Sequence, residues 1–110
     1  MPHPAERAAA RRFRGLPTTR VCGRRVPVAA TRTSRLLGLA LLDRAAAGEG
    51  LLIPRCRSIH TFGMRFALDV VFLDSAARAV SVRRPVPPRR IAADRRAGSV
   101  LELPAAEESS

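Results

Sequence analysis

The sequence predicts a small α+β fold: a strongly bent, mainly antiparallel β-sheet that closes toward a barrel, with one principal helix packed on it. Short segments rich in Leu, Ile and Val recur between residues 51 and 103, and turn-forming residues separate them. Before them, residues 31–47 carry apolar side chains at helical spacing. The 110 residues suffice for one domain, whose core must be aliphatic because the chain has four Phe and neither Trp nor Tyr.

The first 30 residues predict an arm followed by a hairpin. Residues 1–17 are rich in Arg and Ala and lack an apolar stripe, so we expect a flexible arm in which residues 5–14 can form a helical turn. Residues 19–30 are typical of a β-hairpin with its turn at residues 23–25. Pro27 places the second arm at a sheet edge, because proline has no N–H to donate.

One helix is expected after the hairpin. Either Thr31 or Thr33 can cap its first turn, and the helix would run to about Ala47 with Gly48 as its C-terminal stop. Its buried stripe would consist of Leu36, Leu37, Ala40 and Leu41.

The remaining residues predict strands and one basic loop. The strand candidates are Leu51–Ile53, Arg57–Phe62, Leu68–Leu73, Ala79–Val82 and Val100–Leu103. The third is apolar on both faces except at Asp69, so it belongs in the middle of the sheet. Residues 83–90 contain three prolines and are expected to form a stiff loop that pairs with no strand. The domain would span residues 18–104, and residues 105–110 would form a disordered tail.

Four motifs in the chain resemble one known family. They are the R-x-x-GL core at Arg35–Leu39, the Phe62–Met64 segment, the LD-V-V-F-L-D strand at Leu68–Asp74, and the V-L-E-L strand at Val100–Leu103. With this spacing, residues 19–104 resemble the domain of unknown function 192 family, also called uncharacterised protein family 0127. The resemblance implies a fold but no established activity. Relatives continue past the late strand, whereas this chain stops at PAAEESS, so we expect that strand to be an exposed edge through which a homodimer can form.

The chemically capable side chains gather in residues 51–74. Strand alternation places Cys56, Ser58 and His60 on one face, with Thr61 on the other. Asp69 is expected to point toward protein, and a buried carboxylate needs a partner, for which Arg65, Arg35 and His60 are the candidates.

We expect the site to be a polar pocket where His60, Asp69 and Glu102 converge in an otherwise aliphatic sheet. The predicted binding residues are Ser58, His60, Thr61, Met64, Asp69 and Glu102, and the catalytic candidates are His60, Asp69, Glu102 and Cys56. Structural alternatives stand beside these roles. His60 and Ser58 can satisfy each other or the backbone, Cys56 can be a small apolar filler, and Phe62 and Met64 can pack the core or the rim.

No metal or cofactor is predicted. Cys56 and His60 would lie roughly 13 Å apart on a straight strand, too far for one ion. The two cysteines are expected to stay reduced in a cytoplasmic protein, because the N-terminus lacks the apolar run of a signal peptide and no segment is long enough to span a bilayer.

The net charge of +11 is weak evidence for nucleic-acid binding. All 20 basic residues are Arg, as a GC-rich genome favours. Our first hypothesis is therefore a module that binds a small molecule or a protein partner. The alternatives are a hydrolase or transferase that uses His60 with Asp69 or Glu102, and an Arg-driven binder of nucleic acid or acidic surfaces.

Overall fold

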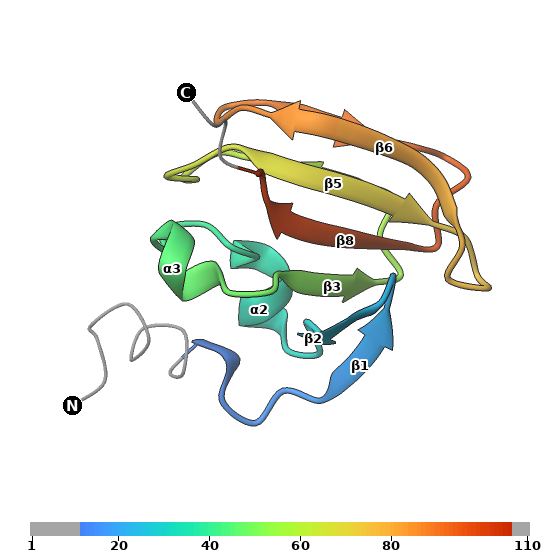
Figure 1. Cartoon of the computed structure of the whole chain (residues 1–110), viewed down its shortest axis with the longest axis horizontal. Coiled ribbons are helices and arrows are strands. Elements are labelled where there is room, and N and C mark those ends of the chain that lie inside the picture. The colour runs from blue at the N-terminus through green and yellow to red at the C-terminus, as the bar shows by residue number, and fades with distance from the viewer. Residues whose placement is uncertain (1–11, 107–110) are drawn as a thin grey trace.

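A computed structural model describes residues 12–106 of the chain as a set of short antiparallel β-sheets with two short helices (Figure 1). The central sheet has four strands in the order β3-β8-β5-β6, and the pairs β1-β2 and β4-β7 form two smaller sheets. The elements are β1 (Thr18–Val21), β2 (Arg24–Pro27), α2 (Arg32–Leu37), α3 (Arg44–Ala47), β3 (Leu51–Pro54), β4 (Ser58–His60), β5 (Leu68–Leu73), β6 (Ala79–Val86), β7 (Ile91–Ala93) and β8 (Ser99–Pro104).

The predicted fold class is wrong in two respects. The strands form three separate sheets, none of them closed, instead of one sheet closing toward a barrel. The helical region, which was expected to be one principal helix, consists of two helices of six and four residues. It breaks at Gly38, where φ is +53°, and again at Leu41, where φ is +66°, because an α-helix requires negative φ at every residue. Leu36 and Leu41 are consequently exposed instead of forming a buried stripe.

The predicted ends of that helical region are confirmed. Thr31 caps α2: its hydroxyl accepts a hydrogen bond from the backbone N–H of Ser34, and the Ser34 hydroxyl accepts one from the backbone N–H of Thr31, both at 3.1 Å. Gly48 ends α3. The predicted hairpin also forms, but its turn lies one residue earlier, at Cys22 and Gly23, both with positive φ.

Strand β5 lies inside the central sheet, as its sequence predicts, and all six of its residues are buried. Strand β8 was expected to be an exposed edge, but it pairs with β3 on one side and β5 on the other (Figure 1). The expectation of a dimer through this strand is therefore wrong, because both of its hydrogen-bonding edges are already occupied.

The proline-rich segment is also corrected. Residues 83–86, expected in a loop, extend β6, where Arg83 pairs with Val70 and Val86 with Leu68. Strand β6 is the edge of the central sheet, where Pro85 is tolerated because one side of an edge strand has no ladder partner. Strand β7 was not predicted, since Ile91–Ala93 is too short to show a period.

The two faces of the central sheet support two separate cores. On one face, Val70, Phe72 and Val100 pack with residues of the α2–α3 region, of β3 and of β4. On the other, Val71 and Leu101 pack against the β1–β2 hairpin. Of the predicted arm, Phe13 and Leu16 pack against the first core, and residues 1–11 lie outside the described part.

At the other end of the chain, Ala105 is buried and its N–H donates to the carbonyl of Ala67 at 2.9 Å. The rest of the expected tail is described only as far as residue 106. No helix in residues 12–106 is long and apolar enough to cross a membrane.

Candidate functional site

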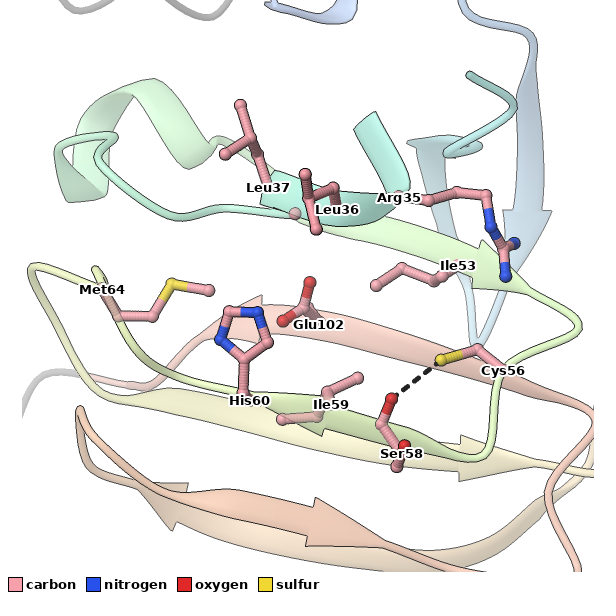
Figure 2. Close-up of a pocket in the computed structure, with 11 residues that line it drawn as sticks. Arg35, Leu36, Leu37, Ile53, Cys56, Ser58, Ile59, His60, Met64 and Glu102 are labelled. Carbon is pink, nitrogen blue, oxygen red and sulfur yellow. Dashed lines mark hydrogen bonds between the residues drawn. The ribbon is translucent and has the colours of Figure 1, made fainter. Parts of the chain in front are cut away.

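A pocket of about 140 Å³ lies between α2 and the strands β4 and β8 (Figure 2). Its volume is comparable to a cavity that accepts benzene. The walls are mainly apolar, and the ionisable side chains among them belong to Arg35, Cys56, His60 and Glu102. The lining residues are Arg35, Leu36, Leu37, Gly38, Ile53, Cys56, Ser58, Ile59, His60, Met64 and Glu102.

Glu102 supplies the carboxyl group of the pocket. On β8 it lies on the same face as Val100, and its neighbours across the strands are Leu51 and Val70. Its side chain is 2% exposed, and Oε1 has no hydrogen-bond partner among residues 12–106. Burial away from water penalises the charged form and raises the pKa of Glu102 to about 8. The carboxyl group is therefore mostly protonated at neutral pH.

Gly38 makes room for that carboxyl group. A Cβ atom at residue 38 would lie 2.5 Å from Oε1 of Glu102, closer than real Cβ contacts come. The residue also has φ +53° and ψ −125°, a conformation that L side chains rarely adopt. The end of α2 thus approaches β8 closely only because residue 38 has no side chain.

His60 presents its imidazole to the pocket from β4. Its Nδ1 accepts the backbone N–H of Phe62 at 3.2 Å, so in the neutral ring Nε2 carries the proton. Figure 2 shows the ring pointing toward the Glu102 carboxyl group. The exposed ring of Phe62 lies beside it, with ring centroids 5.9 Å apart. The alternative role in which His60 satisfies a backbone group is therefore correct for this hydrogen bond.

Asp69 does not line the pocket that His60 and Glu102 line. It pairs with Leu103, the residue after Glu102, and side chains of successive strand residues point to opposite faces of the sheet. Its carboxylate forms an ion pair with Nε of Arg84 at 3.3 Å, not with the expected Arg65, Arg35 or His60. The predicted convergence of His60, Asp69 and Glu102 is therefore reduced to His60 and Glu102.

Of the other predicted site residues, three line the pocket and one stabilises a loop outside it. Ser58 and Cys56 line the pocket, where the Cys56 thiol donates to the carbonyl of Ser58 at 3.0 Å. Met64 lines it and also belongs to the core. Thr61 faces the other way, and its hydroxyl donates to the Pro87 carbonyl at 2.7 Å, so it holds the loop that leads into β7.

Six lining residues were not predicted as site residues, and Gly38 and Arg35 are two of them. Gly38 and Arg35 both belong to the R-x-x-GL motif, which is the sequence signal that pointed to them. The Arg35 guanidinium donates to the carbonyls of Pro54 and Arg55 and so fixes the loop that carries Cys56. Residues 12–106 contain no cluster of three or more His, Cys, Asp or Glu side chains suited to a metal ion.

Comparisons with known proteins place the fold but name no activity. A solved structure of a protein of unknown function from Novosphingobium aromaticivorans is similar, with a TM-score of 0.62, 17% identity, and coverage of 80% of this chain and 71% of that one. No curated protein matches. The model of the DUF192 family, described as "Uncharacterized ACR", matches residues 17–108. The chain therefore belongs to the DUF192 family.

Proposed function

We propose that this chain is a binding module whose pocket holds a small organic molecule, with an apolar body and one polar end, without changing it chemically. The observation that carries the proposal is the buried Glu102 carboxyl group, which lines a pocket with mainly apolar walls and whose Oε1 has no hydrogen-bond partner among residues 12–106. A buried carboxyl group without a partner costs free energy, and a ligand that hydrogen-bonds to the group recovers part of that cost.

A catalytic role for the same pocket has less support. His60 and Glu102 line one cleft, which favours proton transfer. However, the Cys56 thiol donates to a backbone carbonyl and not to His60, so the described residues offer no nucleophile held by a base. We therefore keep the hydrolase or transferase hypothesis second.

Cysteine labelling tests the binding proposal within one molecule. Cys56 lines the pocket, whereas Cys22 is exposed in the β1–β2 turn. We expect millimolar 1-butanol or n-butylamine to slow alkylation of Cys56 by iodoacetamide severalfold and saturably, because the occupant limits access to the thiol. Alkylation of Cys22 should not change. Peptide mass spectrometry reads both rates in the same sample.

Asp69, on the face of the central sheet opposite to Glu102, provides the matched control. Asp69→Asn should leave protection of Cys56 intact, whereas Ile53→Trp, which fills the pocket, should remove it. Neither probe protecting Cys56, or equal slowing of Cys56 and Cys22, would refute a small-molecule site in this pocket.

Weak nucleic-acid binding remains our prediction for the basic surface. If the Arg excess reflects only genomic composition, affinity for duplex DNA should be independent of sequence and mostly lost at physiological salt. Titration of labelled duplexes of two unrelated sequences at low and at physiological salt measures this. Nanomolar affinity that persists at physiological salt would instead favour the Arg-driven binder.

A further inference from the structure

Among residues 12–106 the buried carboxyl group of Glu102 has no ion-pair partner, although the chain contains 20 arginines. Arg35, on the pocket wall, and Arg12, which reaches the C-terminal end of α2, are both used elsewhere. Arg35 donates to the carbonyls of Pro54 and Arg55, and Arg12 donates to those of Gly38 and Ala40. Among residues 12–106, therefore, nothing pairs with this carboxyl group, whose Oε1 is buried without a hydrogen-bond partner.

The surroundings of the Glu102 carboxyl group define which ligand would fit. A carboxylate is an acceptor, so its complement carries N–H or O–H donors, and a cation is the strongest such partner. The walls contributed by Leu37, Ile53 and Met64 are apolar and suit a hydrocarbon segment. Figure 2 shows these side chains around the carboxyl group. The volume of about 140 Å³ limits the ligand to a benzene-sized body.

We propose that the pocket binds small primary amines as their ammonium ions, with the ammonium group paired to the carboxyl group of Glu102 and the hydrocarbon part against Leu37, Ile53 and Met64. This proposal rests on the binding function proposed above and names its ligand class. Leu36, Ser58 and His60, which also line the pocket, are exposed to solvent.

Proton balance gives the proposal a specific signature. At neutral pH the amine arrives as RNH₃⁺ and the Glu102 carboxyl group holds its proton. Pairing requires the carboxylate, so the complex forms as RNH₃⁺ with the ionised Glu102, and one proton leaves to the buffer. Affinity should therefore increase with pH until the free protein has itself lost that proton, and should then level off while the amine remains charged.

Other groups near the carboxyl group need their own controls. The titratable or charged side chains that line the pocket with it are His60 on β4, Cys56 before β4 and Arg35 on α2. Arg12 reaches the same end of α2, and Asp69 lies on the opposite face of the sheet. His60→Asn and Cys56→Ser report whether either of those groups is the source of the released proton.

The experiment compares n-butylamine with 1-butanol, two probes of the same shape of which one is cationic. Isothermal titration calorimetry at pH 7, in two buffers of different ionisation enthalpy, measures affinity and proton release together. We expect the amine to bind at least tenfold more tightly than the alcohol, with release of close to one proton. Glu102→Gln should remove both the preference and the release, whereas Asp69→Asn, on the opposite face of the sheet, should retain them.

The possible failures separate the two proposals. If 1-butanol binds as tightly as n-butylamine and protects Cys56, the pocket binds small molecules but the amine assignment is wrong. If the amine preference persists in Glu102→Gln, another group is responsible and the assignment is also wrong. If neither probe protects Cys56 nor gives a saturable heat, the binding function itself is refuted, together with the amine proposal.

Discussion

Gly38→Ala is expected to lower the free energy of unfolding by about 2 to 4 kcal/mol. Part of this cost is backbone strain, because residue 38 has φ +53° and ψ −125°. The other part is steric, because the new Cβ would lie 2.5 Å from Oε1 of Glu102. Urea-induced unfolding of wild type and variant at pH 6 measures the sum.

Gly48 separates these two contributions. It ends α3 with nearly the same backbone conformation, φ +56° and ψ −129°, but a Cβ there meets nothing within 4 Å. Gly48→Ala should therefore cost only the strain, about 1 to 2 kcal/mol less than Gly38→Ala. In a double-mutant cycle, Glu102→Ala should remove most of the extra loss of stability that Gly38→Ala causes relative to Gly48→Ala. Equal costs at the two glycines would show that Glu102 does not occupy the space beside Gly38.

Glu102→Gln is expected to change how stability depends on pH. Burial raises the pKa of Glu102 from its ordinary 4.5 to about 8 in the folded protein. Between these two values the folded chain keeps a proton that the unfolded chain has lost, so wild-type stability is fully present below pH 4.5 and falls as the pH rises toward 8. The slope should approach about 1.4 kcal/mol for each pH unit.

Gln has the shape of the protonated acid but cannot ionise, so Glu102→Gln should flatten this slope and become the more stable protein above pH 8. Glu49→Gln is the matched control, because Glu49 is exposed and pairs with Arg24 on the surface. It should leave the slope unchanged. Asp94 does not interfere, since hydrogen bonds from Arg96 and Ser81 lower its pKa and place its effect at acid pH. A wild-type stability that is flat or rising from pH 5 to 8 would contradict a protonated Glu102.

Where structure depends on near neighbours in the chain, the prediction succeeded. The apolar run Leu68–Leu73 became the buried strand β5, and Thr31 became the cap of α2. A strand period and a capping hydroxyl depend only on residues a few positions apart. The same reasoning failed across Gly38, because an apolar helical pattern does not show that one residue takes positive φ.

The site depends both on local sequence patterns and on how strands that are distant in the chain pair. The sequence by itself determined which side chains are chemically capable, and alternation placed His60 opposite Thr61 along one strand. Only the tertiary structure decided which of them meet. Alternation assigns faces within a strand, whereas the face that two strands share depends on their register, and a shift of one residue reverses it. The register of β5 with β8 therefore put Glu102 in the pocket with His60 and left Asp69 on the opposite face, paired with Arg84.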